Sequence, residues 1–279
     1  MSQPALSAHS ARPLPRFDGV VEHWRTDGTP GQGNAPAGLV LVCEHASNTL
    51  PEGWPELGGD LGLSAASRAS HAAWDIGALG LARGLAARLA PVAGGVVLVH
   101  APLSRLAYDL NRAPDHPAAM PVKSEIHEVP GNRSLSAAER LARTEAICLP
   151  FHETLSRQIA RLVAQGRRPA LIAVHSFTPV YFGQSRAVEF GVIHDDDQTL
   201  TTAVMAAARN CGLDTRLNEP YSAAGDVTHT IRLHAVPMRL PNTMLEIRND
   251  LIADAPAQAA MADRLAPVLA TALRATGAV

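Results

Sequence analysis

Two histidines stand at the ends of apolar runs that are typical of buried strands. His45 follows Gly38–Cys43 after one intervening residue, and His175 follows Ala170–Val174 directly. Ligands of parallel α/β sheets bind at the carboxyl ends of the strands. Neutral imidazole is also a common ligand of zinc. The sequence therefore predicts that the two imidazoles meet at one edge of a sheet and share a metal ion, although each could instead hydrogen-bond within its own loop.

A catalytic zinc site normally has three protein ligands, and the sequence leaves the third one open. The segment His71–Asp75 places an imidazole and a carboxylate four residues apart, on one face if that stretch is helical. Asp75 could instead cap a helix that continues to Leu89. Glu44 adjoins His45, but successive side chains along a strand point to opposite faces. Asp75, His71 and Glu44 all remain candidates.

A polar segment at 103–112 carries two arginines, an aspartate and an asparagine. A guanidinium can hold a carboxylate through two parallel hydrogen bonds. Arg112, with Asn111 beside it, is thus a candidate for binding an acidic substrate. The alternative is an internal ion pair between Asp109 and an arginine, and both interpretations can hold if Asp109 orients that arginine.

Glu246 lies inside the apolar run Thr243–Ile247. A buried carboxylate is costly unless it is paired or used in the chemistry of a site. Glu246 could be the general base that takes a proton from a water activated by the metal. The alternative is a structural ion pair with Arg248 or Arg232.

Composition narrows the class of protein. The chain has 279 residues, is 47% hydrophobic and 18% charged, and carries a formal net charge of -2. This balance gives no reason to expect a nucleic-acid or membrane partner. Three widely spaced cysteines without a C-x-x-C pair indicate neither a disulfide framework nor a cysteine zinc site, so we expect a reducing, cytoplasmic location. The oligomeric state stays open.

Strand and helix patterns alternate along the chain, which predicts an α/β fold with a mostly parallel or mixed central sheet covered on both faces. We expect residues 1–35 to be a loosely ordered leader and residues 36–279 to form a single domain. A long loop is expected at 113–132, and a capping box at Ser136–Glu139 predicts a helix start. The expected strands are 38–43, 96–100, 170–175, 190–193 and 243–247, and the expected helices are 67–89, 136–165, 199–211 and 255–276.

Six segments in order give the chain a resemblance to the N-formylglutamate amidohydrolase family of zinc-dependent hydrolases. The resemblance extends from about Leu39 to Ile252. Its segments are Cys43–Asn48, Trp74–Ala78, Ser104–Arg105 with Asp109–Arg112, His175–Pro179, Asn218–Tyr221 and Leu245–Ile252.

The resemblance implies a zinc-carboxypeptidase-like and aspartoacylase-like three-layer fold. It also implies hydrolysis of the N-acyl amide of an amino acid such as N-formylglutamate, with zinc or another divalent ion as cofactor. His45, His175 and Asp75 would be the metal ligands, Glu246 the base, and Arg105 a group that stabilises the oxyanion. The resemblance implies Asn111 and Arg112 in binding the substrate carboxylate. Ser47, Ser176, Tyr221 and Arg248 are further residues that we expect to bind substrate.

Two departures from the family pattern leave alternatives. Asn48 occupies the position where carboxypeptidase-like sites often have a glutamate three residues after the histidine. The start Cys43–Glu44–His45 differs from the Pro-His-Ser-Gly form associated with enzymes that act on formylglutamate itself. A different acyl group or a non-catalytic binding protein is therefore possible. A hydrolase with Cys43 or Ser176 as nucleophile is another alternative, although Ser176 lacks the G-x-S-x-G elbow.

Overall fold

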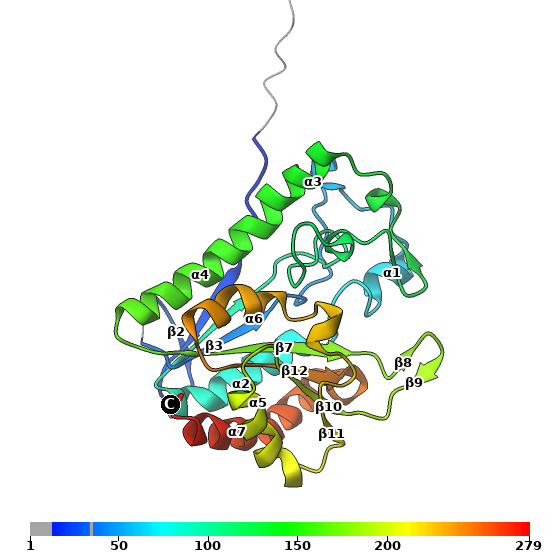
Figure 1. Ribbon diagram of the computed structural model, residues 1–279. Helices are drawn as coiled ribbons and strands as arrows, with labels where there is room; N and C mark the ends of the chain where they lie inside the picture. Colours follow the sequence, from blue (N-terminus) through cyan, green and yellow to red (C-terminus); the bar gives the residue numbers. More distant parts are fainter. Residues whose placement is uncertain (1–12, 34–35) are drawn as a thin grey trace, which may run out of the picture.

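An eight-stranded mixed sheet runs through the middle of the molecule (Figure 1). The computed structural model describes residues 13–33 and 36–279. Across the sheet the order is β11-β10-β12-β7-β3-β4-β1-β2. The strands are β1 (Val20–Trp24), β2 (Pro30–Gly31), β3 (Leu39–Cys43), β4 (Val96–His100), β7 (Ala170–Phe177), β10 (Phe190–Ile193), β11 (Thr215–Leu217) and β12 (Asn242–Arg248).

The four central strands, β12, β7, β3 and β4, are parallel to one another. Their carboxyl ends therefore meet at one edge, as the two histidine-bearing runs predict. Strands β10 and β1 flank this group in antiparallel orientation. β3 is buried along its whole length. Burial on both faces explains why this strand is a continuous apolar run rather than an alternating one.

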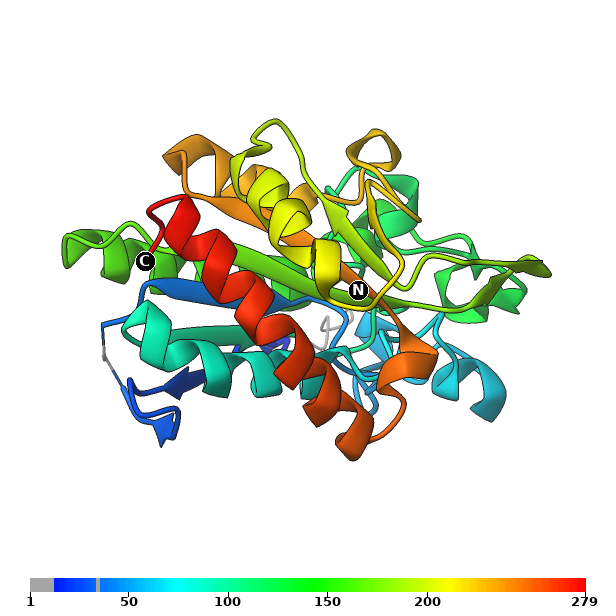
Figure 2. The same ribbon diagram turned by 90° about the horizontal axis from the view of Figure 1, so that it is seen from below.

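Helices cover both faces of the sheet, so the expected three-layer α/β fold is confirmed. Helices α2 (Ala78–Ala93), α5 (Thr199–Ala207) and α7 (Ala255–Ala275) lie on one face (Figure 2). Helices α4 (Leu149–Ala164) and α6 (His229–His234) lie on the other face. Alternate residues of β3 divide between the two cores: Leu39 and Leu41 pack toward α2 and α7, while Val40 and Val42 pack toward α4.

The predicted helix over 67–89 is broken, which corrects the expectation for Asp75. Helix α1 covers only Ala65–Ala69, and α2 begins at Ala78. Gly77 precedes α2 with φ of 82°, and a Cβ there would lie 2.2 Å from the carbonyl oxygen of Ile252. Only glycine fits such a left-handed, tightly packed position. Asp75 thus lies in a turn, neither on a helical face with His71 nor capping α2.

The capping box at Ser136 and Glu139 is confirmed at the start of α3 (Ala137–Arg143). A π-helical turn at Thr144–Cys148 then joins α3 to α4. Pro150 is the second residue of α4, directly after this π-helical turn, and the chain stays helical on both sides of it. The expected loop at 113–132 holds a small hairpin of β5 (Lys123–Ser124) and β6 (His127–Glu128).

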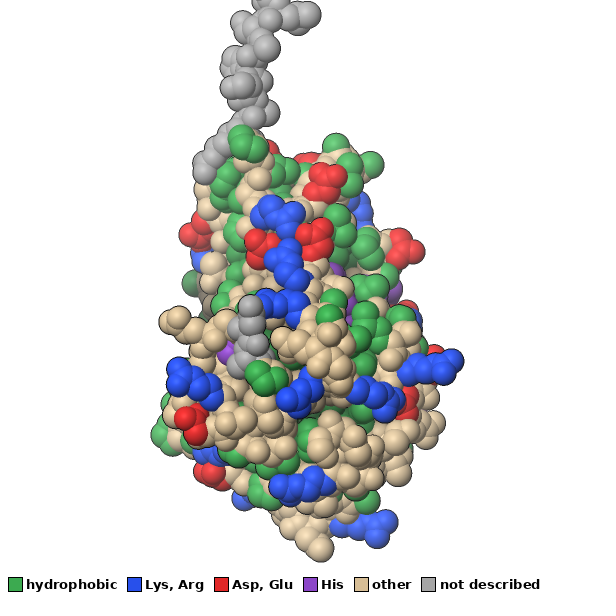
Figure 3. Space-filling view, turned by 90° about the vertical axis from the view of Figure 1, so that its left-hand side faces the viewer, with side chains coloured by type: hydrophobic (Ala, Val, Ile, Leu, Met, Phe, Trp, Pro, Cys, Tyr) green, Lys and Arg blue, Asp and Glu red, His purple; other side chains and the backbone are tan. Residues whose placement is uncertain are grey.

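The predicted leader is covered only in part, since residues 1–12 and 34–35 lie outside the described residues. Residues 20–24 of this stretch form β1, which pairs with β4 over five residues. In the part of the chain that the structure describes, no helix combines the length and apolarity needed to cross a membrane. The face seen in Figure 3 carries scattered basic side chains with acidic ones among them.

On the face of the sheet that α4 covers, the side chain of His152 lies between two hydrogen-bond partners. Its Nε2 lies 3.1 Å from the carbonyl oxygen of Leu110 and its Nδ1 lies 3.0 Å from Nε2 of His234. The carbonyl can only accept, so Nε2 of His152 carries the proton and Nδ1 accepts from His234. This arrangement needs neutral rings. Burial lowers the pKa of His152 to about 3 and that of His234 to about 4.

Stability should consequently fall in acid. Below the ordinary histidine pKa of 6.5, the unfolded chain binds a proton at His152 that the folded chain refuses. Unfolding free energy is therefore lost as the pH drops from about 6.5 toward 3, by up to about 1.4 kcal/mol per pH unit. Urea unfolding at pH 5 to 8 checks this: His152→Gln should flatten the slope relative to the wild type. An unchanged slope would contradict the assignment.

Candidate metal centre and active-site chamber

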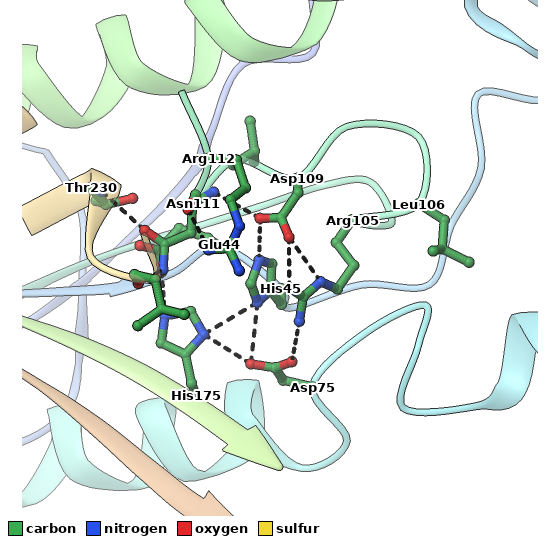
Figure 4. Close-up of polar contacts among 12 residues, drawn as sticks. Glu44, His45, Asp75, Arg105, Leu106, Asp109, Asn111, Arg112, His175 and Thr230 are labelled. Atoms are coloured by element: carbon green, nitrogen blue, oxygen red, sulfur yellow. Dashed lines mark hydrogen bonds and ion pairs between the residues drawn. The ribbon is translucent and has the colours of Figure 1, made fainter. Parts of the chain in front are cut away.

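Three donor atoms converge beyond the carboxyl ends of β3 and β7 (Figure 4). Nδ1 of His175 lies 3.2 Å from Nδ1 of His45 and 2.9 Å from Oδ2 of Asp75. Nδ1 of His45 lies 3.3 Å from the same carboxylate oxygen. All three side chains are buried. The structure thus brings the two predicted histidines together, with Asp75 as the third member of the group.

The group fits a divalent metal ion. Ligands about 2.0–2.2 Å from a tetrahedral zinc are separated by roughly 3.3 Å, close to the spacing of these atoms. Two imidazole nitrogens and one carboxylate oxygen are also a donor set that zinc and several other divalent ions accept. His45, Asp75 and His175 therefore form a group that could hold a metal ion.

Main-chain contacts fix the turn that delivers Asp75. Its backbone N–H donates to the carbonyl oxygen of His45 at 2.9 Å. Its Oδ2 accepts from the backbone N–H of Ser176 at 3.2 Å. Burial raises the pKa of Asp75, but the two neighbouring imidazoles outweigh this and hold it well below its ordinary value. Asp75 is therefore an anion aimed at the histidines.

The Nε2 atom of each histidine, which faces away from the three-donor group, lies next to a carboxylate. Nε2 of His45 lies 2.8 Å from Oδ1 of Asp109, and Nε2 of His175 lies 3.2 Å from Oε2 of Glu44. Second carboxylates of this kind fix ring orientation and strengthen metal binding. Burial raises the pKa of Glu44, but His175 outweighs it and lowers the value to about 2. Glu44 contacts Nε2 of His175, on the side of the ring away from the three donor atoms. The geometry therefore does not favour Glu44 as the third ligand.

Arg105 balances part of this negative charge. It donates from Nε and Nη2 to Oδ2 of Asp109, at 3.2 and 2.6 Å, and its Nη1 lies 3.4 Å from Oδ1 of Asp75. The alternative of an internal Asp109 ion pair is thus present, and Asp109 orients both Arg105 and His45. Burial lowers the pKa of Arg105, but Asp109 and Asp75 raise it further, so the guanidinium stays charged.

Glu246 differs from Glu44, Asp75 and Asp109 in that it forms no ion pair with an arginine or histidine among the described residues. It lies on β12 directly across from His175 of β7, and its Oε2 is buried without a hydrogen-bond partner. Burial raises its pKa to about 7 because no arginine pairs with it among the described residues. The alternative of a structural pair is not seen: Arg248 contacts Asp250 and Glu189, and Arg232 contacts Asp195 and Asp226.

These side chains open into a chamber of about 830 Å³. Its wall includes residues of two hairpins. One is the β5–β6 hairpin, and the other is formed by β8 (Val180–Tyr181) and β9 (Gln184–Ser185). The predicted site residues that line it are His45, Asp75, Arg105, Asn111, Arg112, His175, Ser176, Tyr221 and Glu246.

His71 also lines the chamber, but its ring points to a different partner. Its Nε2 lies 3.1 Å from a carboxylate oxygen of Glu125, at the tip of the β5–β6 hairpin. His71 is not a member of the three-donor group. The broken helix explains this, since His71 and Asp75 do not share a face.

Two predicted substrate-binding residues lie off the chamber wall. Oγ of Ser47 accepts from the backbone N–H of Thr49, which shapes its own loop. Arg248 donates to the carbonyl oxygen of Ala187 at 3.2 Å and pairs with Asp250 at 2.8 Å. In the structure Arg248 therefore holds the segment after the β8–β9 hairpin, and its role in binding substrate stays a prediction.

Asn111 and Arg112 lie on the wall beside α6. The Asn111 side chain donates to the carbonyl oxygen of Val227 and accepts from the backbone N–H of Thr230 at 3.0 Å. Arg112 donates only to backbone carbonyl oxygens, those of Asn111 and Asp226, and its buried Nε has no partner. Asn111 therefore anchors the wall, while Arg112 keeps a guanidinium without a carboxylate.

The geometry gives no support to a nucleophilic cysteine or serine. Cys43 is fully buried in the core next to α2, and burial raises its pKa well above the ordinary value. Oγ of Ser176 donates to the carbonyl oxygen of Ile76 at 2.8 Å rather than to a histidine. Neither side chain has an imidazole positioned to remove its proton.

Sequence reasoning missed the part that Glu44 and Asp109 have in the site. Glu44 follows the apolar strand β3, and Asp109 lies in the segment 103–112; both side chains are buried. Their burial indicates a role in the site, because burying an unpaired carboxylate is costly. Which histidine each one contacts depends on the strand arrangement, which the local sequence does not show.

We expect removal of a donor to empty the centre of metal. His175→Ala should reduce bound metal from about one ion per chain to a small fraction, measured by elemental analysis after dialysis. Glu44→Gln should weaken metal binding by about 10- to 100-fold through the loss of ring orientation. His71→Ala is the matched control, since it changes a chamber histidine outside the group and should retain metal. Equal metal content in wild type and His175→Ala would refute the ligand assignment.

Comparisons with known proteins identify the family of the chain. The family model for N-formylglutamate amidohydrolase matches residues 37–253. No curated protein matches the chain. Among solved structures, the gene product Atu2144 from Agrobacterium tumefaciens is 46% identical, with a TM-score of 0.83 over 93% of this chain and 96% of that one. N-formylglutamate amidohydrolase from Ralstonia eutropha JMP134 is 16% identical, with a TM-score of 0.61 over 92% and 97% of the two chains, and shows the same fold. The chain belongs to the N-formylglutamate amidohydrolase family, and is a hydrolase acting on linear amide bonds.

Proposed function

We propose that this protein is a zinc-dependent amidohydrolase that removes the N-formyl group of an acidic amino acid such as N-formyl-L-glutamate. The observation that carries the proposal is Glu246. It is a buried carboxylate that forms no ion pair among the described residues, its Oε2 has no hydrogen-bond partner there, and it lies across from the metal-ligand candidate His175 on the wall of the chamber. A family that hydrolyses linear amides needs such a base beside its metal.

His45, Asp75 and His175 would hold the ion. When bound, zinc polarises the substrate carbonyl and makes water more acidic. The three carboxylates Glu44, Asp75 and Asp109 surround this point, and Arg105 alone offsets them at close range. The surplus of negative charge favours a divalent cation over a neutral ligand.

Glu246 then accepts a proton from the attacking water and returns it to the leaving amine. Its raised pKa, about 7, is well matched to accept and release a proton near neutral pH. The Nη1 atom of Arg105 reaches toward the centre and contributes positive charge where the oxyanion develops. Arg112 holds the α-carboxylate of the substrate, since no carboxylate of the described residues forms an ion pair with it.

The activity is tested with purified protein and N-formyl-L-glutamate. We expect formate release that a strong chelator abolishes and that added zinc restores. A series with N-acetyl and longer acyl groups places the preferred acyl group. Formate release that is unaffected by complete metal removal would contradict the proposed mechanism.

Glu246→Gln separates the base from the binding groups. The amide keeps the size of the side chain but accepts no proton, so kcat should fall by about 10²- to 10⁴-fold while metal content stays unchanged. Elemental analysis and steady-state kinetics are measured on the same preparation. Turnover near the wild-type value would remove Glu246 from the mechanism.

A further inference from the structure

A second guanidinium without an acidic partner among the described residues, that of Arg186, lies against three aromatic rings of the chamber wall. Of the basic residues that line the chamber, Arg105 is paired with Asp109 and Asp75, and Lys123 is paired with Glu128. Arg112 contacts only backbone carbonyls. Behind the β8–β9 hairpin, Arg186 has no acidic partner among the described residues either.

Three aromatic rings hold Arg186 in place. Its guanidinium carbon lies 4.4 Å from the ring centre of Tyr181, 5.1 Å from that of Tyr221 and 5.7 Å from that of Phe177. All three rings line the chamber. Cation–π contacts of this kind orient a guanidinium and shield it from water without cancelling its charge. Arg186 is therefore an oriented cation next to the chamber.

The hydrogen-bonding capacity of Arg186 is mostly unused. Its Nη1 donates to the phenol oxygen of Tyr221 at 3.1 Å. An arginine carries five N–H donors, and the guanidinium of Arg186 makes no other hydrogen bond among the described residues. A carboxylate is the ligand that a guanidinium fork fits best, through two parallel hydrogen bonds. The remaining N–H donors of Arg186 are therefore suited to binding a carboxylate.

The backbone around Arg186 is fixed from both sides. The N–H of Arg186 donates to the carbonyl oxygen of Pro179 at 2.8 Å, which closes the hairpin. Arg248 donates to the carbonyl oxygens of Arg186 and Ala187. Arg248 thus supports the segment that carries Arg186. A guanidinium that is held by neighbouring aromatic rings and by a fixed backbone is suited to discriminating between ligands.

Tyr221 connects Arg186 to the reacting centre. Its phenol oxygen contacts Arg186, and its pKa is raised to about 12, first by burial and then by the charge of Glu246. Gly191, which pairs with Glu246 across the sheet, allows this approach: a Cβ there would lie 2.0 Å from the carbonyl oxygen of Glu219, two residues before Tyr221. One tyrosine side chain therefore separates Arg186 from the neighbourhood of the base.

We propose that Arg186 is a specificity-determining residue that binds the side-chain carboxylate of the substrate, while Arg112 binds the α-carboxylate. This inference rests on the proposed function and deepens it. Two guanidiniums on different connections, one after β4 and one after β9, suit an N-acyl amino acid with two carboxylates. A neutral side chain of the same size would leave the charge of Arg186 unpaired.

The test compares N-formyl-L-glutamate with N-formyl-L-glutamine, two substrates of equal size that differ in one charge. The wild type should prefer the glutamate substrate in kcat/KM by about 10- to 100-fold. Arg186→Gln should bring this ratio close to one, mainly through a higher KM for the glutamate substrate. Arg186→Lys should keep part of the preference because it keeps the charge.

Two controls separate recognition from structure. Arg88→Gln removes one positive charge on α2, where Arg88 pairs with Asp263, and should leave the preference unchanged. If Arg186 only stabilises the hairpin, Arg186→Gln lowers kcat/KM for both substrates in parallel, which overturns the proposal. A wild type without preference for the glutamate substrate overturns it as well.

Failure of the proposed function gives a different result. If the wild type hydrolyses neither substrate, binding of both compounds is measured by calorimetry on the metal-loaded protein. Loss of N-formyl-L-glutamate binding alone in Arg186→Gln would support the role of Arg186 without the reaction. Equal binding of both compounds to the wild type, or equal loss in the variant, would overturn it.

Discussion

The contact of one carboxylate oxygen of Asp75 with Nδ1 of both His45 and His175 is the constraint on which the site depends. Three polar side chains buried so closely are costly unless each is paired or bound to a cation. The surrounding structure supplies that pairing. Asp109 and Glu44 lie next to the far nitrogens of the two rings, and the backbone N–H of Ser176 donates to the Asp75 side chain.

Different environments give chemically similar carboxylates different roles. Asp75, Asp109 and Glu44 lie next to cations or imidazoles, which hold their pKa values low. Glu246 is also buried but forms no ion pair among the described residues, so burial outweighs the attraction of the nearby imidazoles and raises its pKa to about 7. Carboxylates whose environments move their pKa values apart are typical of sites that combine charge stabilisation with proton transfer. The sheet provides this contrast because β12 and β7 place Glu246 opposite His175.

Most of the chamber wall comes from connections, while two of the three candidate metal donors, His45 and His175, lie at or just beyond strand ends. This division gives a rigid centre and a variable surround. Arg248 illustrates it, since it follows the strand that bears Glu246 and holds the segment that bears Arg186. Tyr221 is placed in the same way, by the close passage of its segment over Gly191. In the proposed function, the chemistry and the choice of substrate are therefore set by different parts of the fold.

Much of this fold follows from local sequence. Apolar runs of strand length predicted β3, β4, β7, β10 and β12, because strands buried on both faces need continuous apolar residues. The capping box at Ser136 and the long periodic helix α7 were predicted for equally local reasons. The two histidines could be placed together because both follow strands of one parallel sheet. The family segments then added Asp75 and Glu246.

Tertiary structure decided the rest. The helical spacing over 67–89 continues through Ser70, yet the chain turns there, since Gly77 must pass against Ile252, a residue far away in the sequence. β1 was missed because its only long partner is β4, some 75 residues later. The pairing of Glu44 with His175 and of Asp109 with His45 likewise depends on how separate segments pack. Local sequence determines which residues can form strands, helices and ligands, whereas contacts between distant segments determine which of them meet, because those contacts exist only once the sheet has assembled.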